Sequence, residues 1–348
     1  MDRFELRLQD YSLSEDQESV RDAFSQFFAK ECPSTVVRAA EPLGYDKQLW
    51  HRLVDMGVTS MSLPAALGGD EATLVDLTLI AEELGRTVAP VPFISHVVAT
   101  RLLAAAGTDA ELIQAAVAGD RPFAVALQPL RPGEAQLVPD AAVAGDVIAL
   151  EADALVLTSA DKASPHLLNQ GSTPLGWWQP PAGAGRIVLA EGTTALALHA
   201  RAVREWKLLT AAALIGMTEA ALALAVEFAK TRETMGVPIG SLQGVAFPLA
   251  DVAIGVSGGR NVIWRAAWMA ENEPGVRPEL VPIAYANATR VATHGTTTSA
   301  HMQGGLGFTI EADASLYFLR AKGWSVLGGD PNLDLITVGD AVLASAAR

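Results

Sequence analysis

The sequence predicts an α+β protein with a helical amino-terminal domain (1–120), a small middle β domain (121–203) and a carboxy-terminal helical bundle (204–348). Three observations lead to this prediction. Apolar residues recur at helical spacing in the first region, short apolar and β-branched runs separated by Pro, Gly and Asp follow from Arg121, and long apolar helical patterns fill the chain from Lys207. With 348 residues, the chain can bury a sizeable core.

The amino-terminal domain is predicted to be mostly helical. Ser14 and Gln17 have the spacing of a capping box, which marks a helix start. Residues 47–57 place apolar side chains on one helical face, and helical patterns return at 72–85 and 96–107. In the middle domain, five short runs predict strands: FAVAL, DVIAL, ALVLTS, RIVLA and ALALHA.

The bundle is predicted to open with a helix that is apolar on nearly every side and therefore buried. Lys207 and Glu219 interrupt the apolar run, so a membrane span is not expected. Further helices are predicted at 243–272, 279–302, 311–327 and 331–347. Pro248 suits a helix if it lies in the first turn, and Gly258–Gly259 predicts a kink or a close helix contact.

The first helix breaks at Gly236 and Pro238, and the break carries Arg232, Thr234 and, shortly after, Gln243. A guanidinium, a hydroxyl and an amide that converge from a turn are suited to binding a phosphate group.

The order R-x-T-M-G-x-P-I-x-x-x-Q across 232–243 resembles the signature with which the acyl-CoA dehydrogenase family contacts FAD. HMQGGLGF, residues 301–308, resembles the second FAD stretch of that family, with His301 where glutamine is usual. His301 could instead act as a general base or serve packing; the packing interpretation is favoured. The resemblance implies FAD as cofactor and these cofactor-binding residues: Arg232, Thr234, Met235, Gln243, His301, Gln303, Gly304 and Gly305.

The middle domain departs from the family pattern. It lacks the TEP-then-GSD loop, in whose place the chain reads ALQPLRPGEAQ, and it lacks the Trp-x-Thr strand. In the family these segments flank the flavin ring and the acyl chain. Trp177 and Trp178 could stack on a flavin or adenine ring, but an aromatic plug in a Pro-rich loop is favoured.

The catalytic carboxylate of the family is also missing. Acyl-CoA dehydrogenases remove a proton α to the thioester and pass a β-hydride to flavin N5, so they need a general base. The usual glutamate position aligns with Gly328, two residues before Asp330. The alternative position on the long helix aligns with Trp206, one residue from Glu205.

The resemblance therefore implies an enzyme subunit without a catalytic residue of its own, since the substrate side is lost and the FAD contacts remain. The expected assembly is an α2β2 acyl-CoA dehydrogenase of actinobacterial steroid degradation, in which a homologous catalytic subunit supplies the base and this chain completes the partner's FAD site. An acyl-CoA substrate and an acceptor of the electron-transfer flavoprotein type are implied, and the chain alone is expected to be inactive.

Two alternatives stay open. One is a self-sufficient homo-oligomeric flavoenzyme that uses Glu205 or Asp330 as a relocated base. The other is a flavin-free structural or regulatory homologue that kept only the fold.

Composition limits the partners. A net charge of −14 argues against binding to nucleic acid or to an anionic membrane. Cys32 is the single cysteine, so no internal disulfide is possible and a metal site is not expected. The sequence does not open with a secretion signal, which predicts a cytoplasmic protein. Half of the residues are hydrophobic and the mean hydropathy is +0.26, so other subunits are expected to cover part of the surface.

Overall fold

The computed structural model describes residues 12–131, 133–159, 163–180 and 185–346. The chain forms two compact units, each built from separate stretches of sequence. The first unit comprises Met1–Ser34, Leu74–Ala89 and Lys207–Arg348, and the second comprises Thr35–Thr73 and Pro90–Trp206. The three-domain division expected from the sequence stays a prediction, because the compact units do not follow chain order.

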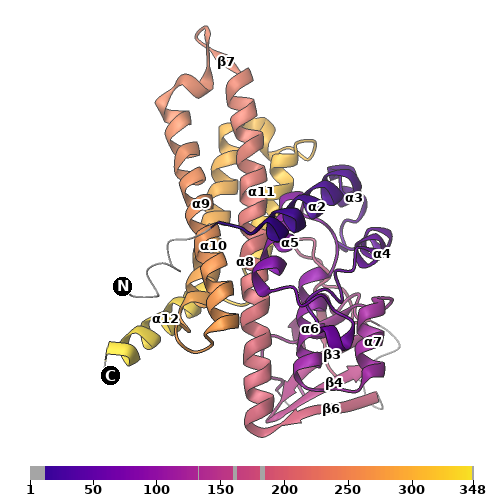
Figure 1. The fold of residues 1–348 in the computed structure, drawn as a ribbon. Helices are drawn as coiled ribbons and strands as arrows, with labels where there is room; N and C mark the ends of the chain where they lie inside the picture. Colours follow the sequence, from indigo (N-terminus) through magenta and orange to yellow (C-terminus); the bar gives the residue numbers. More distant parts are fainter. Residues whose placement is uncertain (1–11, 132, 160–162, 181–184, 347–348) are drawn as a thin grey trace. The chain divides into compact units, whose positions relative to one another are not determined.

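The first unit is a helical bundle (Figure 1). Its helices are α2 (Glu15–Glu31), α5 (Leu74–Thr87), the second part of α8 (Gly192–Thr231), α9 (Gln243–Asn272), α10 (Leu280–Met302), α11 (Asp313–Trp324) and α12 (Pro331–Ala346). It also contains the short hairpin β7 (Glu233–Thr234) and β8 (Val237–Pro238) and the 3-10 turns η2 (Ile239–Ser241) and η3 (Gly304–Phe308). Helix α2 packs against α5, and α10 packs against α9, α11 and α12. The helices predicted for the bundle are confirmed.

Local signals explain several of these helices. The capping box is confirmed, because the Gln17 N–H donates to Ser14 Oγ and the Ser14 N–H donates to Gln17 Oε1. Helices α5 and α8 cross closely at Gly85 and Gly216. A Cβ on Gly85 would lie 1.9 Å from the Ala213 carbonyl oxygen, so only glycine allows this approach.

Two features of α9 test the sequence analysis. Gly259 marks a close helix contact as predicted, since a Cβ there would lie 2.5 Å from Ile215 Cδ1. Pro248 lies inside the helix, beyond the first turn that was expected. Proline has no backbone N–H, so the carbonyl of Gly244 loses its helical hydrogen bond. Gly244 is exposed, so this carbonyl can bond to water instead.

The second unit combines helices with small sheets. Its elements are α3 (Ser34–Ala39), α4 (Lys47–Asp55), η1 (Ala65–Leu67), α6 (Phe93–Ala105), α7 (Ala110–Ala118), β1 (Phe123–Val125), β2 (Gln136–Val138), β3 (Asp146–Glu151), β4 (Ala154–Ser159), β5 (Gly176–Trp178), β6 (Gly185–Glu191) and the first part of α8. Four strands form a sheet in the order β1-β3-β4-β6, with β1 parallel to β3 and the other pairs antiparallel, while β2 and β5 pair separately. Four of the five predicted strands are confirmed.

The fifth predicted strand, ALALHA at 195–200, is wrong, because α8 already begins at Gly192. Its alternation suggests a strand, but buried residues recur here at Ala195, His199, Ala202 and Trp206, and Glu205 beside Trp206 is buried as well. Their spacing of four, three and four residues is that of a helix face.

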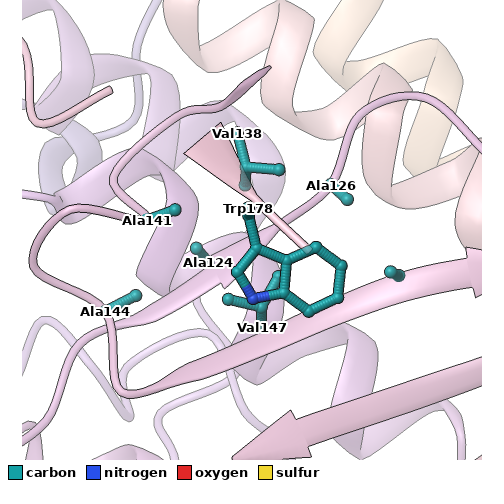
Figure 2. Packing of buried hydrophobic residues seen from close by; sticks show 8 residues of the cluster. Ala124, Ala126, Val138, Ala141, Ala144, Val147 and Trp178 are labelled. Atoms are coloured by element: carbon teal, nitrogen blue, oxygen red, sulfur yellow. The ribbon is translucent and has the colours of Figure 1, made fainter. Parts of the chain in front are cut away.

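The two tryptophans of β5 lie on opposite faces of the strand, and Figure 2 shows the buried one, Trp178. Trp178 is 3% exposed and packs in a cluster with Val138, Val147 and several alanines, so it is a core residue within a strand rather than a plug in a loop. Trp177 is 48% exposed, because successive side chains of a strand point to opposite faces.

Helix α8 is long and apolar enough to cross a membrane, but 72% of its most apolar 18-residue window is buried in the protein. Its part in the bundle packs as a core helix.

Candidate functional site

A tight hairpin presents the first predicted cofactor stretch. Strands β7 and β8 pair with Thr234 opposite Val237, which leaves Met235 and Gly236 as a two-residue loop. Both have positive φ, 52° and 78°, as a type I′ turn requires. The turn therefore fixes a methionine in a backbone conformation that L-residues rarely adopt, and its side chain is 96% exposed.

The polar side chains of this stretch point to solvent. Arg232, Thr234 and Gln243 are all exposed. Within the described residues, none of the three side chains has a hydrogen-bond or ion-pair partner, although the Arg232 backbone is held by Phe228 and Ile239. A guanidinium without an internal partner keeps its full capacity to bind an anion from outside the chain.

The second predicted stretch lies where α10 ends. His301 and Gly304–Gly305 are exposed, and Gln303 is half-buried with its amide 3.4 Å from the Ser299 carbonyl oxygen. Gly304 has φ of 61°, and a Cβ on either glycine would meet no atom within 4 Å. The backbone is thus open to close approach by a ligand, as expected for a phosphate or ribose contact.

Both stretches lie at one end of the bundle. Met302, beside the second stretch, packs against the buried cluster of Ala225, Ala229 and Leu249, and Ile239 from the first stretch packs against the same cluster. The structure therefore brings the eight predicted cofactor residues to the same end of the first unit, with the polar groups facing outward.

Gly328, the position that the sequence aligns with the usual catalytic glutamate, is buried. The Gly328 N–H donates to the Tyr285 hydroxyl oxygen at 3.3 Å, and that hydroxyl donates to the Ser325 carbonyl at 3.2 Å. Lys207 Nζ lies 5.4 Å from the centre of the Tyr285 ring and 2.6 Å from Asp334 Oδ1. This network serves packing and holds no carboxylate free to accept a substrate proton.

The alternative base position is also filled. Trp206 is buried, and the neighbouring Glu205 is 6% exposed. Arg101 Nε donates to Glu205 Oε2 at 2.9 Å, and Arg201 Nε donates to Oε1 at 2.8 Å. Burial raises the pKa of this carboxyl, but the Arg101 and Arg201 guanidinium groups more than offset that effect and hold the pKa below its usual range. Such a carboxylate is a weak base, so the geometry does not favour Glu205 as the relocated base.

Asp330 has a structural contact as well. Its Oδ1 accepts from the backbone N–H and the side-chain amide of Asn332, both at 2.9 Å, at the start of α12. This is the arrangement of a carboxylate that caps a helix N-terminus.

Sequence reasoning missed the cations that pair with Glu205 and with Asp334. Arg201 precedes Glu205 by four residues on one helix, a spacing that could have suggested the pair. Arg101 and Lys207 could not have been found, because their partners are far away in sequence. A second network in the bundle was also missed, in which Arg86 and Arg260 both bind Glu219, at 2.7 and 2.6 Å.

Among the described residues, no cluster of His, Cys, Asp or Glu has the arrangement of a metal site. The candidate site consists of exposed polar groups at one end of the bundle.

Comparison with known families gives matches at both ends of the chain. Residues 14–112 match the family described as the acyl-CoA dehydrogenase N-terminal domain, and residues 199–343 match the acyl-CoA dehydrogenase C-terminal domain. A curated relative, the acyl-CoA dehydrogenase IpdE2 of Mycobacterium tuberculosis, is 30% identical over 325 residues, which cover 91% of this chain and 94% of the relative.

Two solved structures are similar over nearly the whole chain. The ChsE4-ChsE5 complex from Mycobacterium tuberculosis matches with a TM-score of 0.85 and 26% identity, covering 96% of this chain and 99% of the matched chain. A variant of the Tcur3481-Tcur3483 steroid ACAD matches with a TM-score of 0.83 and 26% identity, covering 97% of this chain and 100% of the matched chain.

Proposed function

Because this chain belongs to the acyl-CoA dehydrogenase family, we propose that it is a non-catalytic subunit of a heteromeric, FAD-dependent acyl-CoA dehydrogenase. A homologous subunit with a catalytic carboxylate is its partner, in an α2β2 assembly that introduces an α,β double bond into an acyl-CoA thioester. The two-chain ChsE4-ChsE5 complex and the Tcur3481-Tcur3483 steroid ACAD support this assembly and a steroid-derived acyl group. Electrons would pass to an acceptor of the electron-transfer flavoprotein type, inside the cytoplasm.

The observation that carries the proposal is a contrast between two sets of polar groups. At the base positions, Glu205 is committed to two arginines and Gly328 offers no side chain. At the bundle end, Arg232, Thr234 and Gln243 have no such commitments within the described residues. Side chains without a partner among the described residues are available to complete a site in another subunit.

The bundle end fits the adenosine diphosphate half of FAD. The Arg232 guanidinium can bind a phosphate oxygen through a charge-assisted hydrogen bond, and the open backbone at Gly304 and Gly305 permits close approach. Thr234, Gln243, His301 and Gln303 add hydrogen-bonding groups, and Met235 offers apolar contact. When bound, FAD supplies the hydride acceptor of the family's reaction.

The two competing hypotheses receive less support. Glu205 as a relocated base conflicts with its two ion pairs, and Asp330 is engaged at the start of α12. A flavin-free homologue gives no reason for a strained Met235 beside an exposed Arg232 whose side chain has no partner in the part of the chain that the structure describes. A colourless complex with every candidate partner would favour that hypothesis.

The test uses the complex of this chain with a co-expressed homologous subunit that keeps a glutamate at the position of Gly328. Arg232→Ala removes a contact worth about 1.5–3 kcal/mol, so FAD affinity should fall roughly ten- to a hundred-fold. The measurement is the flavin-to-protein ratio of the purified complex after dialysis. Arg290→Ala, which removes an exposed arginine of α10, is the matched control.

A complex that stays assembled, keeps full flavin content and retains activity with Arg232→Ala would contradict the proposed role of the bundle end. Loss of flavin with both arginine variants would point to a general effect of charge instead.

A further inference from the structure

Helices α2, α5, α8 and α9 of the first unit line a polar cavity of about 480 Å³. Its wall, as far as the described residues form it, contains neither a predicted cofactor residue nor a base position. Five ionisable side chains of the wall contact one another: Glu82, Glu83, Arg86, Glu219 and Arg260. The cavity is therefore a polar site that the proposed function does not use.

The carboxylates of this network outnumber its guanidinium groups. Glu83 pairs with Arg86 through both oxygens, with Arg86 Nε at 3.0 Å from Oε2 and Nη2 at 3.3 Å from Oε1. Glu82 and Glu219 share Arg260, whose Nη2 lies 2.5 Å from Glu82 Oε1 and 2.6 Å from Glu219 Oε2. Three carboxylates against two guanidinium groups leave one negative charge uncompensated, and such a charge is costly to bury.

The wall of α2 does not supply the missing positive charge. Arg21 and Asp22 both line the cavity, and they pair with each other, with Arg21 Nη2 at 3.2 Å from Asp22 Oδ1. This pair adds one charge of each sign. The cavity as a whole therefore keeps an excess of one negative charge.

Two carboxylate oxygens of the wall are available to a guest. Arg260 and Arg86 contact Glu82 only through Oε1, and they contact Glu219 only through Oε2. Glu82 Oε2 and Glu219 Oε1 thus have no partner in the described part of the chain, although Glu82 is only 6% exposed. Burial raises the pKa of Glu82 in spite of the Arg260 contact, so this carboxylate favours the arrival of a positive charge, either a proton or a bound cation.

The rest of the wall suits an organic cation. Trp264 and Leu79 add aromatic and apolar surface to the cavity, and an aromatic face attracts ammonium and guanidinium-type cations. The described residues contain no cluster with the arrangement of a metal site. We propose that the cavity binds a small organic monocation, whose N–H groups donate to Glu82 and Glu219 and whose apolar part contacts Trp264.

Three probes of nearly the same shape test this on the unmodified full-length chain. Benzamidine carries one positive charge, benzamide is neutral and benzoate carries one negative charge. Isothermal titration calorimetry should show binding of benzamidine at millimolar concentration or below, and no binding of the other two. The benzamidine Kd should rise as the pH is lowered, because protons compete with the probe for Glu82.

A charge-removing variant tests the assigned acceptor. Glu219→Gln keeps the shape of the side chain but removes a charge that the probe contacts, so the benzamidine Kd should rise at least about tenfold. Glu227→Gln is the matched control, since Glu227 is an exposed glutamate of the same helix outside the cavity wall. It should leave the Kd unchanged, and circular dichroism checks that both variants fold.

Absence of benzamidine binding at every pH would overturn the proposal and would indicate that a proton on Glu82 balances the charge instead. Equal binding of benzamide, or equal Kd values for Glu219→Gln and Glu227→Gln, would overturn it as well. The titrations of the unmodified chain need no variant, so a misfolded Glu219→Gln chain would not prevent the test. Neither flavin nor a partner subunit takes part, so these results are independent of the proposed function.

Discussion

Polar side chains at the exposed end of the bundle and those at the buried base positions differ in whether they have partners within the chain. At the bundle end, Arg232 and Gln243 point to solvent with no partner among the described residues. At the base positions, Glu205 is held by Arg101 and Arg201, and the Gly328 N–H is bonded to Tyr285. A buried ion is costly unless it is paired, and once paired it has little capacity left for chemistry. The difference indicates which region can serve another molecule.

The largest effect is expected in the turnover rate, when the isolated chain is compared with the complex. The isolated chain is expected to give no dye reduction with any acyl-CoA, because neither base position offers a free carboxylate, whereas the co-expressed complex should turn over. Stopped-flow or steady-state dye assays measure this. If the isolated chain turns over and Glu205→Gln abolishes that activity, Glu205 acts as a base and the buried region serves catalysis after all.

The next largest difference between the two regions is expected in the free energy of unfolding. Arg101→Ala leaves the Glu205 carboxylate buried with one cation fewer, which should lower the free energy of unfolding by about 3–5 kcal/mol. Arg232→Ala removes an exposed side chain and should change it by less than about 0.5 kcal/mol. Urea denaturation of the isolated chain measures both. Equal losses would show that the exposed arginine also supports the fold.

Lowering the pH from 7 to 5 should reduce the free energy of unfolding, because the buried His96 resists protonation in the folded state. Burial lowers the pKa of His96 from 6.5 to about 4, while Ala116 accepts from its Nε2 and the Phe123 N–H donates to its Nδ1. The unfolded state therefore binds a proton below pH 6.5 that the folded state resists until about pH 4. His96 contributes full stability above pH 6.5, and about 2 kcal/mol of it should be lost by pH 5.

Urea midpoints between pH 7 and pH 5 check this titration. A urea midpoint that does not fall between pH 7 and pH 5 would contradict the role assigned to His96.

The smallest effect is expected at Met235. Met235→Gly relieves the positive φ of a non-glycine residue and should stabilise the isolated chain by up to about 1 kcal/mol. In the complex, the same change should weaken FAD retention if the methionine contacts the cofactor. Thermal unfolding measures the gain in stability, and the flavin-to-protein ratio measures the loss of FAD. A variant that is neither more stable nor poorer in flavin would leave the strained turn without a role.

Patterns along the chain were enough to predict most helices and four strands. The capping box, the apolar faces and the Gly-Pro break act over a few residues, so the sequence carries them directly. ALALHA misled because an alternating run also fits a helix once one face is buried. The pairing of Gln136–Val138 with Gly176–Trp178 joins segments far apart in sequence, which no local pattern predicts.

The sequence by itself determined which chemical groups are present: the motif residues from Arg232 to Gln243, the glycines at 304 and 305, and Gly328 at the position aligned with the catalytic glutamate. Only the tertiary structure decided what each group is free to do. Arg101 meets Glu205 across 104 positions of sequence, and Lys207 meets Asp334 across 127. Whether a carboxylate is a base or half of an ion pair depends on such contacts, because part of the charge that shifts its pKa comes from residues far away in the chain, as Arg101 does for Glu205.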